Sequence, residues 1–249
     1  MIKIFRYELK KLLFNRFFAA LMIVTLCYGY MLLRGSVILG IANTAPFSPW
    51  SFGFYLSSLL PMLAAILLFF IAHLSSKQEK MTQSLTSAAP VPPGLYRFVR
   101  CGAIFTGVFL MSAVCCLLGY IFLGSLFRLE NIPVGEWLLP GLMVLVPALL
   151  FTAGLGMVVG MWRGWAVYGV IGVVLLSAFL PLPNWALLIP TAFFMDYPKT
   201  LGVLDPAFSI PSSMAAGRFV YCVLGILLMA GSLRLRTQTS LVKSKRLRQ

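Results

Sequence analysis

The side chains that could do acid–base or metal chemistry are few in this chain and do not cluster. The 249 residues contain six acidic residues, one histidine and five cysteines. An intramembrane enzyme needs carboxylates, histidines or a nucleophile gathered at one site, but His73 stands alone at the end of an apolar run and the cysteines lack metal-type spacing. No G-x-x-x-x-G-K-S/T sequence occurs, so there is no P-loop for ATP. We therefore expect no enzyme activity, no catalytic residue, and no metal or cofactor bound by this chain.

Two arginines interrupt apolar runs and are the sharpest candidates for contact with a solute. Arg34 and Arg218 each lie near one end of a long apolar segment. A charge at depth in a membrane is costly and usually faces a partner or a water-filled cavity. Both arginines could therefore line a translocation path and meet an anionic or amphipathic cargo. The alternative, which the sequence favours, is that each side chain extends to the lipid headgroups.

Long apolar runs make up most of the chain and must position these residues. The composition is 60% hydrophobic and 10% charged, with a mean hydropathy of +0.95, which is too apolar for a soluble globule of this length. Each run is close to or above the roughly 20 residues that cross a bilayer as a helix. The sequence predicts an all-α integral membrane protein. We place six transmembrane helices at residues 17–41, 52–74, 98–127, 137–162, 165–189 and 213–233.

Positive charge is concentrated on one face of this arrangement. Sixteen of the twenty lysines and arginines fall on that face, which carries a net charge of +14, whereas the opposite face sums to zero. Loops rich in Lys and Arg are cytosolic, so we expect both termini in the cytosol and both Arg34 and Arg218 on the outer side. Because the charge is spread over loop ends beside anionic lipid headgroups, we expect lipid contact and no nucleic-acid partner.

The chain divides into three parts by composition. Residues 1–16 place apolar side chains on one helical stripe and lysines and arginines on the other, which predicts an amphipathic helix lying in the cytosolic interface. The alternative is an N-terminus that simply continues the first span. Residues 17–233 form the six-span transmembrane domain, and residues 234–249 form a basic cytosolic tail.

The polar loop at residues 75–97 is too long for a minimal connection between neighbouring helices. A serine at its start can cap a short helix, which Pro90 would end. Met81 and Leu85 lie on one face of that helix. A short cytosolic helix with a small apolar face suits docking into a groove on a soluble partner.

This loop resembles the cytosolic loop between the second and third spans of bacterial ABC transporter permeases of the type-two (ABC-2-like) exporter family. In that family a charged start, a threonine, a Leu-rich turn and a Pro-Val pair precede the third span. The corresponding residues here are Glu79, Lys80, Thr82, Leu85, Pro90 and Val91. The layout of amphipathic N-terminus, six spans, short loops and basic tail is similar over nearly the full length.

The resemblance implies a permease subunit of an ATP-driven exporter in the bacterial cell membrane, moving an amphipathic peptide, toxin or lipophilic compound. It implies a second permease subunit, in a homodimer or heterodimer, and a separate P-loop ATPase subunit that binds the ATP and magnesium. The loop would carry a coupling helix that the ATPase grips. Its expected coupling residues are Lys77, Glu79, Lys80, Met81, Thr82, Leu85, Pro90 and Val91.

Glycines in the fourth predicted span suggest a helix contact. Gly156, Gly160 and Gly164 recur at every fourth position, a small-xxx-small pattern that lets two helix backbones approach closely. The contact could lie within one subunit or between two. The alternative is the general enrichment of glycine in membrane helices.

The stretch at residues 190–212, after the fifth predicted span, is apolar, rich in proline and aromatic. The resemblance implies short re-entrant helices here, between spans five and six. Such a stretch can enter the membrane only if the protein shields its backbone. An ordinary outer loop with interfacial aromatic residues is the alternative.

Two other classes of function compete with the exporter. A secondary transporter usually has broken helices and polar ligands at the membrane midplane. The long loop after the second span and the long stretch after the fifth are consistent with an inverted repeat, but mid-span carboxylates are absent from the sequence. An intramembrane enzyme is less favoured, because the reactive side chains are scattered.

Overall fold

The computed structural model describes residues 2–74, 93–127, 134–180 and 182–246, and these residues form helices and irregular segments without a strand. The elements are α1 (Ile2–Leu13), α2 (Arg16–Gly35), η1 (Val37–Leu39), α3 (Pro49–Leu74), α5 (Pro93–Phe127), α6 (Val134–Trp162), α7 (Ala166–Ser177), η3 (Asn184–Ala186), α8 (Thr191–Thr200) and α9 (Ser212–Arg246). Among the described residues, α2, α3, α5, α6 and α9 are long and apolar enough to cross a membrane. The all-α fold is therefore confirmed for the described residues, and five of the six predicted spans correspond to helices long and apolar enough to cross a membrane, which indicates a multi-pass membrane protein.

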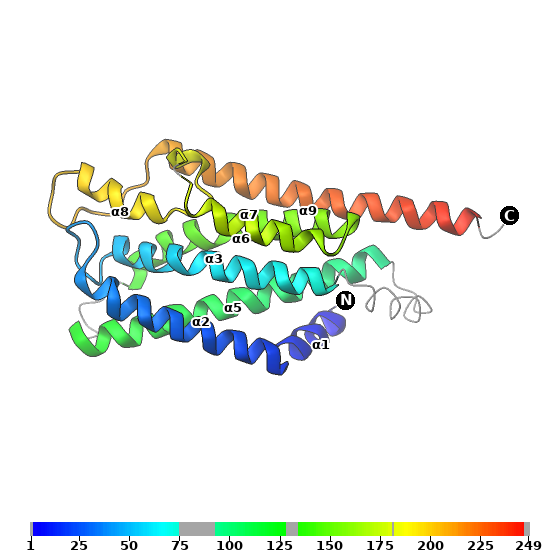
Figure 1. The fold of residues 1–249 in the computed structure, drawn as a ribbon, viewed down its shortest axis with the longest axis horizontal. Coiled ribbons are helices and arrows are strands. Elements are labelled where there is room, and N and C mark those ends of the chain that lie inside the picture. Colours follow the sequence, from blue (N-terminus) through cyan, green and yellow to red (C-terminus); the bar gives the residue numbers. More distant parts are fainter. Residues whose placement is uncertain (1, 75–92, 128–133, 181, 247–249) are drawn as a thin grey trace.

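The long helices run side by side, with α3 in the middle of the bundle (Figure 1). α3 is apolar on every side, and Trp50, Tyr55 and Leu67 on it are completely buried. A helix that is apolar all round is stable where other helices cover it. Both termini lie toward the same end of the bundle (Figure 1), which we name the inner end, and the opposite end is the outer end.

Helix α1 is separate from α2 and does not continue it. The helix is interrupted before Asn15. The side-chain oxygen of Asn15 accepts a hydrogen bond of 2.9 Å from the Phe17 N–H and so caps α2. α1 packs instead against α5. Phe5 and Leu12 of α1 lie against Gly102 and Gly107 of α5, where the absence of side chains makes room for them.

The continuous helix expected over residues 165–189 is not observed. α7 ends at Ser177 and has 12 residues, which is about 18 Å at 1.5 Å per residue, against a hydrocarbon core of about 30 Å. Prolines at 181, 183 and 190 explain the interruption, because proline lacks the N–H of a helix and restricts the residue before it. The short helices η3 and α8 follow.

The C-terminal helix also differs from the expected division into a span and a tail. α9 runs without interruption from Ser212 to Arg246, so the predicted boundary at residues 233 and 234 falls inside a helix. The apolar part ends at Ser232. The remainder projects beyond the bundle at the inner end (Figure 1).

The expected glycine stripe is interrupted, since α6 ends at Trp162 and Gly164 lies in the turn that follows. Gly156 is buried within the subunit, where an added Cβ would meet Leu68 of α3 at 2.7 Å, and Gly160 is also buried. The close helix crossing uses glycines that the stripe does not contain. A Cβ on Gly154 would lie 2.7 Å from the Gly225 carbonyl oxygen, and this approach brings α6 against α9.

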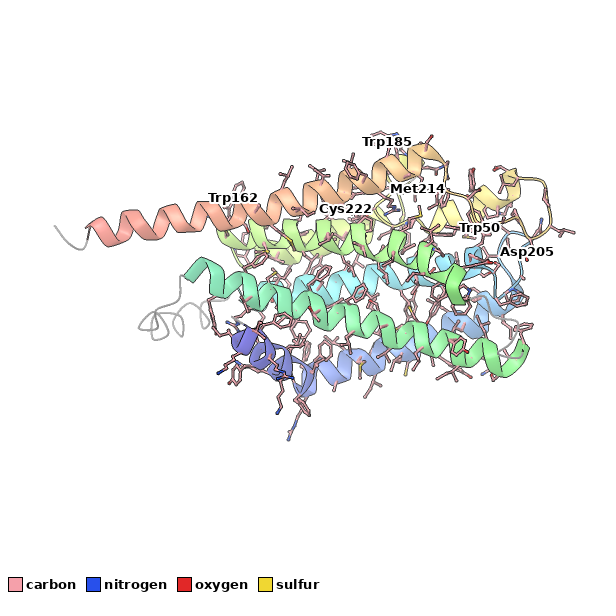
Figure 2. All side chains as sticks on the ribbon, turned by 180° about the vertical axis from the view of Figure 1, so that it is seen from behind. Trp50, Trp162, Trp185, Asp205, Met214 and Cys222 are labelled. Atoms are coloured by element: carbon pink, nitrogen blue, oxygen red, sulfur yellow. The ribbon has the colours of Figure 1, made fainter. Side chains whose placement is uncertain are left out.

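An aromatic cluster closes the outer end. Trp50 of α3 packs against Phe193 and Phe194 of α8 and against Phe208, and its indole N–H donates to the Pro206 carbonyl at 2.8 Å. The ring of Phe194 occupies the space that a Cβ on Gly53 would need. α8 is thus fixed against the first turns of α3, in the region where Figure 2 places Trp50 and Asp205.

Candidate functional site

The predicted coupling helix falls in residues 75–92, which lie outside the residues that the structure describes. The coupling residues that are therefore not placed are Lys77, Glu79, Lys80, Met81, Thr82, Leu85, Pro90 and Val91. The structure does place the two helices that flank this segment. α3 ends at Leu74 and α5 begins at Pro93, and the two helices contact each other.

A buried ion pair ties α1 to the first turns of α5. The Glu8 carboxylate lies 3.1 Å from Nε of Arg100, and the two side chains are 9% and 10% exposed. The Tyr96 hydroxyl donates to the other Glu8 oxygen at 2.9 Å. The Arg100 guanidinium also lies over the Tyr96 ring, 5.7 Å from its centre. Both oxygens of one carboxylate are thereby engaged by the helix that follows residues 75–92.

Sequence analysis did not identify this pair. Glu8 is the only acidic residue of α1, and a partner three residues away, Lys11, would suffice for a surface helix. Glu8 and Arg100 are 92 residues apart, so their contact depends on how α1 packs on α5. A carboxylate buried in an amphipathic helix indicates a specific partner, since burying an unpaired charge is costly.

A small cavity, lined by both polar and apolar side chains, lies beside the ion pair at the inner end. Its volume is about 100 Å³, enough for a few water molecules. His73, at the end of α3, and Lys11 contribute to its lining together with Glu8 and Arg100. His73 is exposed. Side chains from α1, α3 and α5 therefore meet around one water-sized space.

An apolar groove of about 510 Å³ lies between α5 and α6, and Phe52 of α3 also contributes to its lining. α5 and α6 contact each other little, and this leaves the space open between them. None of the residues that the structure places in its lining is charged. Those residues are Phe52, Phe109, Ser112, Ala113, Cys116, Leu117, Tyr120, Trp137, Leu138, Gly141, Leu142 and Leu145. A groove of this size and lining suits the apolar part of a small molecule.

The two candidate arginines have different surroundings. Arg34 is exposed near the end of α2, as expected for a side chain that extends to headgroups. Arg218 is only 5% exposed, so it does not extend outward. Its Nη1 donates to the Leu188 carbonyl at 3.1 Å.

The segment after α7 is fastened to α9 around Arg218. The Tyr221 hydroxyl donates to the Ala186 carbonyl at 2.6 Å. Gly217 lets the backbone approach closely, because a Cβ there would lie 2.0 Å from the Trp185 carbonyl oxygen. Trp185 accordingly lies near the beginning of α9, close to Met214 (Figure 2). Sequence analysis identified Arg218 but missed these neighbouring contacts, which depend on where the chain folds back.

The described residues offer an ion pair at the inner end, an apolar groove along the bundle and a buried arginine in the outer half. Within the described ranges no three His, Cys, Asp or Glu side chains come together in a way that could hold a metal ion. Comparison of the chain with protein-family models, with curated proteins and with solved structures finds no match in any of the three.

Proposed function

We propose that this chain is the membrane-spanning permease subunit of an ATP-driven exporter of the ABC type. It works with a separate P-loop ATPase subunit and a second permease subunit, and it moves an amphipathic peptide, toxin or lipophilic compound out of a bacterial cell. The buried pair of Glu8 and Arg100 is the observation that carries the proposal. It joins the interfacial helix to the helix that begins where the predicted coupling loop ends.

The pair gives a physical route for mechanical work. An ATPase that grips the helix expected within residues 75–92 displaces the start of α5. Because Glu8 holds two side chains of α5, α1 moves with it. α1 is amphipathic and carries three lysines and one arginine, which suits a position among the inner headgroups. The work would thus reach the bundle through α5 while α1 braces it at the membrane surface.

Six crossings remain part of the proposal. α6 ends toward the inner end and α9 begins toward the outer end (Figure 1), so the chain between them must traverse the bundle. We assign that crossing to α7 together with residues 178–180 and 182–190, which include η3. α8 then forms a short helix at the outer side, and both termini are cytosolic.

The apolar groove supports the assignment of the cargo as amphipathic or lipophilic. It lies beside Phe52 and Trp137, whose rings stack 4.3 Å apart, and it is lined by side chains of three helices. A lipophilic molecule can enter such a groove from the hydrocarbon without losing hydrogen bonds to water.

Charge substitutions on the expected coupling helix test the function. Leu85→Asp and Met81→Asp each place a carboxylate on the apolar face of the expected coupling helix, the face proposed to dock on the ATPase. We therefore expect both substitutions to uncouple the ATP turnover of the partner ATPase from transport. Gln83→Asp places the same charge on the opposite face and should leave coupling intact. Purification of the chain should retain a P-loop ATPase. Normal coupling in Leu85→Asp and Met81→Asp would remove the docking role.

A secondary transporter is the second candidate, and the interruption of α7 favours it. Secondary transporters build their solute sites from discontinuous helices, and α7 ends at Ser177, short of a full crossing. Flux measured with the ATPase held inactive separates the two functions. Continued flux establishes the secondary transporter, and arrest of flux establishes the exporter.

A further inference from the structure

Arg218 is a buried cation whose hydrogen-bonding capacity is incompletely used. Its Nη1 donates to the Leu188 carbonyl, but its Nη2 is buried and has no hydrogen-bond partner in the part of the chain that the structure describes. A guanidinium in apolar surroundings is stable only when its charge is compensated and its N–H groups are bonded. The neutral Leu188 carbonyl bonds one of the N–H groups but does not compensate the charge.

The described acidic side chains of the outer half do not supply the missing charge. Of the acidic residues there that the structure describes, Asp196 pairs with Lys199 at 3.2 Å, Asp205 accepts from a backbone N–H at 3.1 Å, and Glu136 is exposed in the first turn of α6. None of these three carboxylates is a hydrogen-bond partner of Arg218. The described residues therefore give this cation no anionic partner, and an anion on another molecule would supply one.

We propose that Arg218 binds the oxyanion of an acidic amphiphile, a carboxylate or a phosphate on an apolar body. Arg presents a planar fork of N–H groups that matches either group with two parallel hydrogen bonds. One arm of the fork now donates to Leu188, and the other points to no acceptor among the described residues. An oxyanion accepts from both arms and replaces the Leu188 carbonyl.

The surroundings of Arg218 select an amphiphile over a free ion. The residues next to it on α9, Phe219 and Val220, are 70% and 52% exposed, and Trp185 across from it is 61% exposed. A molecule that approaches through these apolar side chains needs an apolar body. The inference rests on the proposed function only in naming this molecule as the cargo, since binding itself requires no ATPase.

Contacts other than the Leu188 hydrogen bond hold the covering segment while the anion binds. Tyr221 still donates to the Ala186 carbonyl, and Trp185 still packs on Gly217. Replacement of the Leu188 carbonyl by the oxyanion therefore loosens the covering segment at Leu188 but does not release it from α9. The site can open locally, at the cost of one hydrogen bond to a neutral acceptor.

The test is equilibrium binding of oleate to the purified chain in nanodiscs of phosphatidylcholine, with methyl oleate as the uncharged control. Oleate should bind and methyl oleate should not compete with it. Arg218→Gln should weaken oleate binding about ten- to a hundredfold, the effect of losing a charge-assisted pair of hydrogen bonds. Arg218→Lys keeps the positive charge but loses the planar fork of N–H groups. Its affinity for oleate should therefore lie between those of the unaltered chain and of Arg218→Gln.

Two further variants separate loss of the site from general damage. Lys199→Gln removes a cation from the same end of the molecule but an exposed one, and should bind oleate as the unaltered chain does. Asp196→Asn neutralises the exposed partner of Lys199 and should likewise retain binding. Equal affinity in Arg218→Gln and the unaltered chain, or full competition by methyl oleate, overturns the proposal.

Phosphatidylglycerol in place of oleate distinguishes a resident lipid from cargo. If substitution of Arg218 weakens the binding of oleate, the site is supported as a cargo site. If the substitution weakens the binding of phosphatidylglycerol but not of oleate, the cargo assignment is overturned. The ATPase plays no part in these measurements, so failure of the Leu85→Asp test leaves them interpretable. Loss of oleate binding equally leaves the ATPase coupling test unaffected.

Discussion

Removal of Glu8 should release α1 from α5 by an amount that the structure allows us to estimate. In Glu8→Ala, Arg100 loses the carboxylate 3.1 Å away and the Tyr96 hydroxyl loses its acceptor. Breaking a buried ion pair by removing one partner costs about 3–5 kcal/mol. The adjacent cavity lets water approach Arg100, so we expect the low end, about 3 kcal/mol, for the free energy of opening the contact between α1 and α5.

Hydrogen exchange read by mass spectrometry in nanodiscs measures this opening directly. A change of about 3 kcal/mol corresponds to roughly a hundredfold shift in an equilibrium constant. Amide groups of α1 that are protected by the contact should therefore exchange about a hundredfold faster in Glu8→Ala. Amides in the middle of α6, which lies away from α1, should keep their rates and provide an internal reference.

A double-mutant cycle decides whether the effect belongs to the pair. Glu8→Ala, Arg100→Ala and the double variant should give a coupling free energy of about 2–3 kcal/mol, as expected for charged side chains in direct contact. Lys3→Ala removes an exposed charge from the same helix and should change exchange less than about twofold. A coupling below about 0.5 kcal/mol would refute the reasoning, as would equal acceleration in Lys3→Ala.

Two further predictions concern packing at the bundle's crossing and at its outer end. Gly225→Ala should destabilise the chain by about 1–3 kcal/mol, because the added Cβ meets the Leu150 backbone at 2.7 Å, whereas Gly231→Ala on the same helix meets nothing within 4 Å and should not destabilise. Trp50→Phe should cost about 2 kcal/mol, because the Pro206 carbonyl loses its donor and a cavity opens, and Trp165→Phe at an exposed position should cost little. Thermal unfolding in detergent compares each pair, and equal melting temperatures within a pair would contradict the packing argument.

Hydropathy identified the five long helices because a membrane span needs only length and apolar composition. The same criterion failed over residues 165–189, because hydropathy does not take into account whether the backbone can stay helical. The prolines at 181, 183 and 190 indicated in the sequence that the helix would be interrupted. The segment is as apolar as a span, but α7 ends at Ser177.

Contacts between distant residues were less accessible to sequence reasoning. The four-residue spacing singled out Gly156, Gly160 and Gly164, yet the tightest crossing pairs Gly154 with Gly225 on another helix. Spacing shows which residues share a face, but which face meets a neighbour is decided by the packing of the whole bundle. For the same reason, the sequence shows that Glu8 is charged but does not show that Arg100 is its partner, because that contact depends on the packing of α1 on α5.

The outer half of the bundle shows how a membrane protein tolerates a broken helix. Carbonyl groups that leave helical geometry must find donors inside the protein, because hydrocarbon offers none. Here the donors are side chains on the long helices. Trp50 donates to Pro206, Arg218 to Leu188 and Tyr221 to Ala186, at 2.8, 3.1 and 2.6 Å.

These donors have a consequence for any motion of the outer end. Each hydrogen bond fixes one irregular carbonyl to a rigid helix, so the segment after α7 can move only if the bond is exchanged for another. Trp50 and Tyr221 are neutral donors, so each offers an anionic solute one hydrogen bond but no compensating charge. Arg218 offers a positive charge and a planar fork of N–H groups that can hold an oxyanion with two parallel hydrogen bonds. Of these three contacts, the one at Arg218 is therefore where an acidic solute can most readily replace the protein's own backbone.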